Sequence, residues 1–274
     1  MKTLGRAFLS LYFLLACLPL AWLGMTSLKT RDQAIATHTV LLFRPQAGGF
    51  LGLAEPHAGT IHSFYHYLGN SLWIALLSTL AALVMGTATA YGFSRFRIPG
   101  SADWLFFILS TRFMPPLAVV APILILFRAL DLPNTALGLI ILYTGFNLSL
   151  AVWLMKGFLD DIPRAFEEAA LVDGYSPLQA LFRVVLPQAR RGMAVTAVFC
   201  LISAWNEYGF AMTLNNAHGV TVPVYFAGLQ GNIGGLPWPQ ITAGVLIFVA
   251  PMLAFTVLVR KHLLRGMTFG TIKQ

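Results

Sequence analysis

Two ionisable residues stand inside long apolar runs of this sequence, where a charge has to pair or bind. Arg112 lies in the run 104–127 and Glu207 in the run 192–214. Charges in such segments commonly pair with one another or line a solute pathway. With the amides Asn147 and Asn206, they could surround a hydrated path for a hydroxyl-rich solute. The competing interpretation is structural: Arg112 caps a broken segment, and Glu207 hydrogen-bonds the backbone at a kink.

Histidines and cysteines offer weaker chemistry. His62 and His66 have the i, i+4 spacing that can hold a metal on a helix, and His57 is near them in the sequence. No further ligand is evident, so we expect solvated histidines and no metal site. Cys17 and Cys200 stand in separate apolar runs, which predicts neither a disulfide framework nor a metal site.

Enzymatic signatures are missing from the sequence. No phosphate-binding loop of the Gly-x-x-x-x-Gly-Lys-Ser/Thr type occurs, and glycine is nowhere followed by lysine. Neither a Ser/His/Asp set nor a catalytic pair of carboxylates is evident. We therefore expect no enzyme activity and no cofactor bound by this chain.

Composition sets the fold class. Hydrophobic residues make up 57% of the 274 and charged residues only 10%, whereas soluble domains are about one quarter charged. About 20 apolar residues span a bilayer as a helix. The sequence predicts an all-α polytopic membrane protein with six transmembrane helices, at about 7–28, 68–93, 104–127, 133–155, 192–214 and 241–259. Pro115 and Pro116 predict a break or kink within the third.

Lysine and arginine indicate the orientation, because they concentrate in cytoplasmic segments. With the N-terminus inside, thirteen of the eighteen are cytoplasmic, four are external and Arg112 lies within the membrane. Both termini are therefore expected in the cytoplasm. The net charge of +8 then reflects topology and requires no nucleic-acid partner.

The N-terminal run also has a second interpretation, as a cleaved signal or lipoprotein leader ending near Ala16-Cys17. The apolar run continues to Leu28, which is the length of a membrane span and longer than a signal core. We expect it to be retained as the first span.

Between the fourth and fifth runs, the punctuation predicts two short helices. Asp160 or Asp161 can cap the first, with Pro163 in its opening turn. Asp173-Gly174 can end it in a left-handed turn. The result is a helix-turn-helix on the cytoplasmic side.

The second of these helices is amphipathic. Ser176 can cap it, with Pro177 at its first position. Apolar residues at i, i+3, i+4 and i+7 then share one face, namely Leu178, Leu181, Phe182 and Val185. Such a segment either folds back on the membrane or docks into a groove of a partner protein, and the residues alone leave both open.

A family pattern covers this segment. Glu168-Ala169-Ala170, then Gly174, then Val184-Val185-Leu186-Pro187 resembles the EAA loop of importer-type ABC permeases, which have isoleucine where Val184 stands. Further similar stretches are YLGNSLWIALLSTL (67–80), TRFMPP (111–116), AWNEYGFAMTL (204–214) and RGMTFGTIKQ (265–274). Together they resemble the shorter permease of the carbohydrate-uptake branch, of the maltose and polyol type.

The resemblance implies a complex in the bacterial plasma (inner) membrane. A second, different permease, a homodimeric ABC ATPase holding ATP and Mg, and an extracytoplasmic solute-binding protein would join this chain. One permease domain would cover 1–274, with a cytoplasmic coupling loop at 157–191 between spans four and five. The ATPase-coupling residues implied are Glu167, Glu168, Ala169, Ala170, Asp173, Gly174, Tyr175, Leu186 and Pro187.

Two further expectations concern the C-terminal tail of the chain and an alternative function of the protein. In the family the tail reaches the ATPase, which here implicates Gly270 and Lys273, although the terminal Gln274 departs from the family pattern. The alternative function is a stand-alone secondary transporter driven by an ion gradient, with Arg112 and Glu207 as relay. Such transporters are usually built from internal repeats, and no second half here resembles the first.

Overall fold

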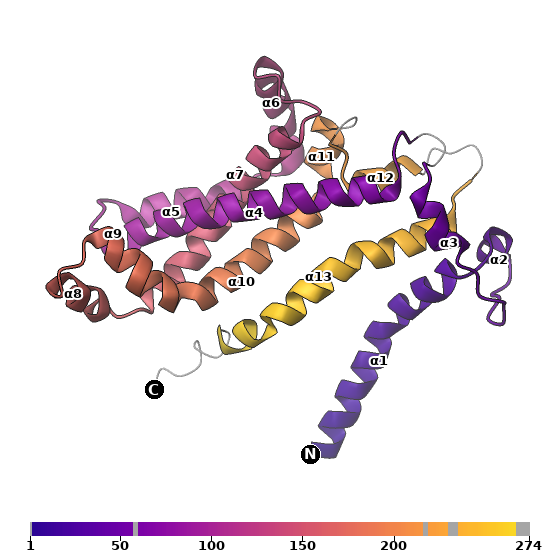
Figure 1. Ribbon diagram of the computed structural model, residues 1–274, viewed down its shortest axis with the longest axis horizontal. Coiled ribbons are helices and arrows are strands. Elements are labelled where there is room, and N and C mark those ends of the chain that lie inside the picture. The colour runs from indigo at the N-terminus through magenta and orange to yellow at the C-terminus, as the bar shows by residue number, and fades with distance from the viewer. Residues whose placement is uncertain (1, 57–59, 216–218, 230–234, 267–274) are drawn as a thin grey trace. The chain divides into compact units, whose positions relative to one another are not determined.

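The computed structural model describes residues 2–56, 60–215, 219–229 and 235–266. Within these ranges the regular elements are helical and no strand occurs (Figure 1). Five helices are long and apolar enough to cross a membrane, and a bent pair makes a sixth if it counts as one span. The expected all-helical, polytopic fold is confirmed. The sides on which the termini lie stay predictions.

The chain forms two compact units. The first comprises Met1–Gly69 with Thr221–Leu253, and the second Asn70–Val220 with Ala254–Gln274. Helices α4 (Phe64–Arg95) and α13 (Trp238–Gly266) each begin in the first unit and end in the second. One permease domain over 1–274 stays a prediction.

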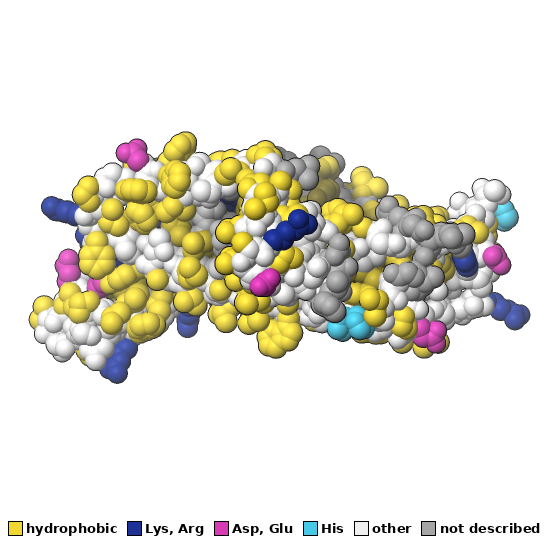
Figure 2. All heavy atoms as spheres, turned by 90° about the horizontal axis from the view of Figure 1, so that it is seen from above, with side chains coloured by type: hydrophobic (Ala, Val, Ile, Leu, Met, Phe, Trp, Pro, Cys, Tyr) yellow, Lys and Arg dark blue, Asp and Glu magenta, His cyan; other side chains and the backbone are white. Residues whose placement is uncertain are grey.

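The first unit contains α1 (Lys2–Ser27), α2 (Arg31–Ile35), α3 (Gly48–Leu51), the 3-10 turn Gly52–Ala54, α12 (Val222–Gly228) and the start of α13. Its core contains an aromatic cluster: the buried Tyr225 packs against Phe64 and Tyr67, with the Tyr67 and Tyr225 rings stacked at 4.9 Å. By contrast, none of the most apolar stretch of α1 is buried. Figure 2 shows apolar side chains spread over the visible face, with few charged ones among them.

Three helices form the body of the second unit: α4, α7 (Ala136–Asp160) and α10 (Leu186–Trp205). Two glycines allow close approach, since a Cβ on Gly86 would lie 2.5 Å from Ala151 and one on Gly192 would lie 2.4 Å from Phe158. At one end of this unit a buried core joins all three helices through Ala90, Met155, Leu159, Val185 and Ala189. This core lies beneath the segment that leads into α8.

The expected break in the third apolar run is confirmed. Helix α5 (Ser101–Ser110) ends in a 3-10 turn (Thr111–Phe113), and α6 (Pro116–Ala129) leaves at 94°. Met114 and Pro115 are extended, with ψ of 126° and 128°. Each precedes a proline, which disfavours helical backbone at the residue before it. Pro116 then takes the first turn of α6, where no N–H is needed.

The segment after α7 departs from the sequence prediction in two respects. Neither Asp160 nor Asp161 caps α8 (Ala165–Val172), because α7 continues through Asp160 and Asp161 is its C-cap. Nor is the second helix short. It begins as α9 (Pro177–Ala180), passes through a π-helical turn (Leu181–Val185) and continues into α10. The π turn comes just before Pro187, whose ring lacks an N–H and disturbs the regular ladder.

The fifth apolar run is interrupted where Glu207 predicts it. Helix α10 ends at Trp205, and α11 (Gly209–Leu214) begins after three non-helical residues. Glu207 therefore stands between two helices instead of inside one.

Candidate functional site

The turn between α8 and α9 is a glycine-dependent helix end. Gly174 has φ +87°, in the left-handed region that side chains with a Cβ rarely adopt. The Gly174 N–H donates to the Leu171 carbonyl at 3.1 Å, and the Tyr175 N–H donates to the Ala170 carbonyl at 3.0 Å. This pair of bonds is a Schellman motif. The predicted left-handed end of the first helix is confirmed.

A capping box starts α9 directly after this turn. The Gln179 N–H donates to Ser176 Oγ at 3.3 Å, and the Ser176 N–H donates to the Gln179 side-chain oxygen at 2.9 Å. Pro177 takes the first helical position. The predicted Ser176 cap is confirmed, and the two motifs fix the backbone angle between α8 and α9.

Apolar side chains project from this helix pair into solvent. We call them the apolar surface of the loop; its members are Phe166, Leu171, Val172, Tyr175, Leu178 and Phe182. Val172 is 87% exposed and Leu178 is 67% exposed. Of the predicted apolar face of the second helix, Val185 is instead fully buried and joins the core of the unit. An exposed apolar cluster on a rigid turn is typical of a protein–protein contact.

Glu167 holds α8 against the end of α4. The Arg95 Nε donates to Glu167 Oε2 at 2.7 Å, and the Tyr91 hydroxyl donates to Glu167 Oε1. The side chains of Arg95 and Glu167 are only 7% and 13% exposed. We call this ion pair with Tyr91 the Arg95–Glu167 clamp.

Backbone acceptors extend the clamp on both sides. Arg95 also donates to the Ile162 carbonyl at 3.1 Å, and Arg164 donates to the Ser94 carbonyl at 2.7 Å. The connection from α7 into α8 and the end of α4 therefore form one hydrogen-bonded unit. In Figure 1 this unit and α9 lie at one end of the three-helix body, away from α6 and α11.

The residues expected to couple to an ATPase do not all point the same way. Glu167 points inward to the clamp and Ala170 is buried, whereas the neighbouring Glu168 and Ala169 are exposed. The other exposed members are Asp173, Gly174, Tyr175 and Pro187, and Leu186 is half-buried. Gly270 and Lys273 lie outside the described residues.

Sequence reasoning missed the α4 side of the clamp. The sequence places Arg95 only among the positive charges of the cytoplasmic side, and the contacts of Arg95 and Tyr91 with Glu167 come from the structure. The two are four residues apart at the end of a span, so they share one face of the helix. That spacing was the available signal.

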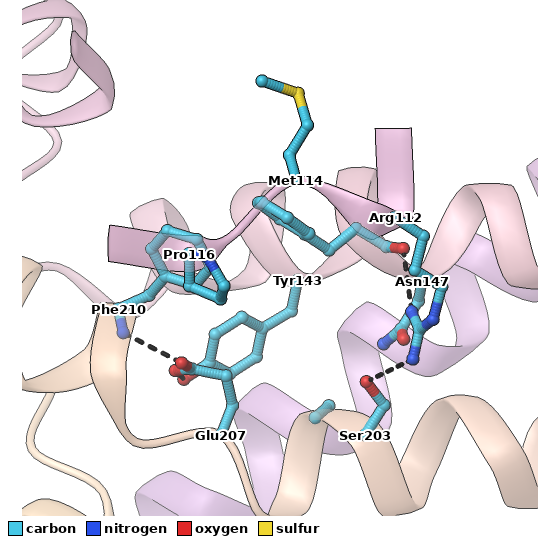
Figure 3. A pocket seen from close by; sticks show the side chains of 10 residues that line it. Arg112, Met114, Pro116, Tyr143, Asn147, Ser203, Glu207 and Phe210 are labelled. Atoms are coloured by element: carbon cyan, nitrogen blue, oxygen red, sulfur yellow. Dashed lines mark hydrogen bonds between the residues drawn. The ribbon is translucent and has the colours of Figure 1, made fainter. Parts of the chain in front are cut away.

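A cavity of about 200 Å³ lies at the other end of the second unit, beside the break between the 3-10 turn Thr111–Phe113 and α6. Its lining residues are Arg112, Met114, Pro116, Tyr143, Phe146, Asn147, Ser203, Ala204, Glu207 and Phe210 (Figure 3). The structure therefore brings Arg112, Asn147 and Glu207 to one cavity, three of the four residues of the expected path. The polar Ser203 and the aromatic Tyr143, Phe146 and Phe210 were not anticipated.

Glu207 is surrounded by donors. The Tyr143 hydroxyl donates to Oε2 at 2.7 Å, and the N–H groups of Phe210 and Ala211 donate to the two carboxylate oxygens at 2.8 and 3.1 Å. These two amides belong to the first turn of α11 and have no partner within that helix. The Glu207 carboxylate thus bonds to the backbone at a kink, the contact that the structural interpretation expects.

Arg112 does not cap its own broken segment. It donates to the Phe146 carbonyl and to Ser203 Oγ, both at 3.2 Å (Figure 3). Among the described residues, no carboxylate lies within ion-pairing distance of Arg112. The Arg112 guanidinium in the cavity is therefore held by two uncharged acceptors, one on α7 and one on α10.

The two amides differ. Asn147 is 1% exposed and donates to the Cys200 carbonyl at 3.1 Å, while its Oδ1 has no donor among the described residues. Asn206 does not line the cavity: its side chain turns back to the Ile202 carbonyl of its own helix, at 2.9 Å. The structure therefore separates Asn206 from the other three.

The histidines form no recognisable metal centre where the chain is described. The rings of His62 and His66 lie 4.2 Å apart, and His57 is outside the described residues. No group of three or more His, Cys, Asp or Glu that could hold a metal occurs in the described ranges.

Comparison with known families defines the class of protein. Residues 82–268 match the family described as binding-protein-dependent transport system inner membrane component. The chain belongs to this family, and the resemblance to ABC importer permeases is confirmed. It is a multi-span membrane permease and not an enzyme.

Individual relatives and a solved structure agree with this class. The trehalose transport system permease protein SugB of Mycobacterium tuberculosis is 31% identical over 94% of this chain and 93% of its own. The sulfoquinovosyl glycerol transport system permease protein SmoH of Agrobacterium fabrum is 29% identical over 93% and 88%. A bacterial ABC transporter that imports the acidic polysaccharide alginate shares the fold, with a TM-score of 0.77 at 22% identity over 95% of both chains.

Proposed function

We propose that this chain is a membrane-spanning permease subunit of an ABC importer, which carries a carbohydrate or polyol into the cytoplasm. A separate homodimeric ABC ATPase, holding ATP and Mg, energises it. A second, different permease and an extracytoplasmic solute-binding protein complete the complex in the bacterial plasma membrane. This chain itself binds no cofactor. Two relatives support the solute class, since SugB belongs to a trehalose transport system and SmoH to a sulfoquinovosyl glycerol transport system.

The helix pair α8–α9 is the observation that carries the proposal. A Schellman turn and a capping box fix its angle, and its apolar side chains point outward. A rigid, apolar helical projection suits a groove on a partner protein. The ATPase is the expected occupant, with Glu168 exposed beside the apolar surface of the loop.

Charge supports a cytoplasmic position for this projection. Arg95 ends α4 and Arg97 follows it, Lys156 lies in the last turns of α7, and Arg164 precedes α8. All four belong to the end of the second unit that carries α8. Positive residues favour the cytoplasmic side, which would place both termini there in a six-span topology.

Two connections can transmit motion from the projection to the membrane. Helix α9 continues into α10, which carries the cavity residue Ser203, and α8 is fixed to α4 by the Arg95–Glu167 clamp. When ATPase closure displaces α8–α9, α10 and the end of α4 would move with it. Rigid-body displacement of packed helices is an established way to alternate access.

The proposal predicts a stable complex with a measurable response. This chain, co-expressed with candidate permease and ATPase partners and purified through its own tag, is expected to bring the ATPase with it. After reconstitution in lipid, ATP hydrolysis should rise when solute-loaded binding protein is added. If the chain purifies alone and moves solute under an ion gradient, the secondary-transporter alternative replaces this proposal, although the comparisons do not favour it.

The tail beyond α13 is proposed as a second contact with the ATPase, through Gly270 and Lys273. Deleting 269–274 is expected to weaken retention of the ATPase during purification and to lower stimulated hydrolysis. Unchanged retention and unchanged transport would remove the tail from the coupling interface.

A further inference from the structure

The cavity around Arg112 has dimensions that limit what it can hold. Its volume is about 200 Å³, below the ~300–1,000 Å³ of pockets that enclose drug-sized ligands. A space of this size suits a single sugar ring or a short polyol.

The two charged groups of the cavity differ in how much of their hydrogen-bonding capacity the protein itself uses. The Glu207 carboxylate accepts from three donors supplied by Tyr143, Phe210 and Ala211. A guanidinium has about five N–H donors, and among the described residues two of those of Arg112 reach acceptors, on Phe146 and Ser203. Arg112 therefore keeps donors for a solute, whereas Glu207 is committed to the protein.

The net charge of the cavity indicates which kind of solute group would accept a hydrogen bond from Arg112. One arginine and one glutamate line the cavity, so its formal charge is zero. A solute carboxylate would add a net negative charge to a site within the membrane, and an uncompensated charge is costly there. A hydroxyl oxygen accepts the same hydrogen bond from Arg112 without that cost.

Aromatic rings supply the remaining contact. Phe146 and Phe210 have ring centroids 4.7 Å apart, and both line the cavity with Tyr143. Binding sites for small solutes generally combine an apolar or aromatic wall with a few fixed polar groups. The C–H face of a sugar ring suits such a wall, while its hydroxyl groups suit Arg112 (Figure 3).

We infer that this cavity is a solute subsite for one uncharged, hydroxyl-bearing unit, in which Arg112 donates to hydroxyl oxygens and Glu207 balances its charge. The inference rests on the proposed function and makes this subunit a direct contributor to solute selectivity. Ser203 and the Phe146 carbonyl are positioning groups, because they hold the guanidinium. Because Ser203 lies on α10, movement of that helix would change its hydrogen bond with Arg112. The position of the guanidinium, and hence its contact with the solute, would then change.

The test is direct solute binding to the whole complex, reconstituted in nanodiscs without the binding protein. Radiolabelled maltose, trehalose and sorbitol are the uncharged probes, and glucuronate is the charged one. The wild-type complex should bind at least one uncharged probe more tightly than glucuronate. Arg112→Ala should weaken that binding about 10- to 100-fold, as expected for a lost hydrogen bond from a charged donor.

Three variants separate recognition from structure. Arg128→Ala removes an arginine at the end of α6 that does not line the cavity, and it should bind the probe as wild type does. Ser203→Ala should weaken binding less than Arg112→Ala. Glu207→Gln, which leaves the cavity with a formal charge of +1, should shift preference toward glucuronate, provided that the variant retains the ATPase.

Several results would overturn the inference. These are unchanged binding in Arg112→Ala, preference of the wild type for glucuronate, or no binding of any uncharged probe by a complex whose ATPase responds to the binding protein. Failure of the wild-type chain to assemble with an ATPase would count against the proposed function instead, so the two failures are distinguishable.

Discussion

Replacing Gly174 with valine is expected to abolish solute uptake and the stimulation of ATP hydrolysis, while the chain still reaches the membrane. Gly174 has φ +87°, and a side chain with a Cβ in this region costs about 1–3 kcal/mol, most of all for a β-branched residue. The Schellman turn should open and change the angle between α8 and α9. Uptake and ATPase assays on the reconstituted complex measure the loss.

Matched variants show whether backbone angle is the cause. Apart from its chain neighbours, no atom of the described residues lies within 4 Å of the position that a Cβ on Gly174 would take, so internal collision does not explain an effect. Gly174→Asn should retain much of the activity, because asparagine tolerates the left-handed region, and Gly174→Ala should be intermediate. Gly157→Ala, within helix α7 and with similarly open space, should be silent. Equal loss in the asparagine and valine variants would instead indicate that the partner cannot accept any side chain at this position.

Local motifs in this chain could be predicted from sequence because their partners are close along the chain. Ser176 and Gln179 are three residues apart, and the extended backbone at Met114 and Pro115 follows from the prolines directly after them. The left-handed turn at Gly174 is equally local. Each depends on the stereochemistry of a few adjacent residues.

Contacts between residues that are far apart in the sequence could not be predicted in this way. Arg95 and Glu167 are 72 residues apart, and Arg112 and Ser203 are 91 apart, so only the packing of helices decides that they meet. The Asn206 side chain could likewise point to the cavity or to its own helix. Its rotamer and the end of α10 decide this, and neither can be predicted from the sequence. The continuity of α9 with α10 depends on a π turn that absorbs Pro187, and composition alone does not reveal it.

Two adjacent glutamates in α8, Glu167 and Glu168, provide a test of the Arg95–Glu167 clamp together with its control. Glu167→Gln is expected to destabilise the helix pair and to uncouple ATP hydrolysis from uptake, because it leaves the nearly buried Arg95 without its carboxylate. Removing one partner of a buried ion pair costs about 3–5 kcal/mol. Among the described residues, the exposed Glu168 makes no such ion pair. Glu168→Gln should therefore weaken ATPase retention and leave the thermal stability of the subunit unchanged.

A charge swap separates the clamp from a direct contact of Glu167 with the ATPase. If the pair acts by joining α8 to α4, Arg95→Glu with Glu167→Arg should recover part of the thermal stability and of the uptake per ATP hydrolysed that either single change loses. A double-mutant cycle on these two quantities should give a coupling energy of about 1–3 kcal/mol for stability. Additive losses, with no recovery in the swap, would mean that Glu167 acts on the ATPase directly and that α4 does not follow α8 through this pair.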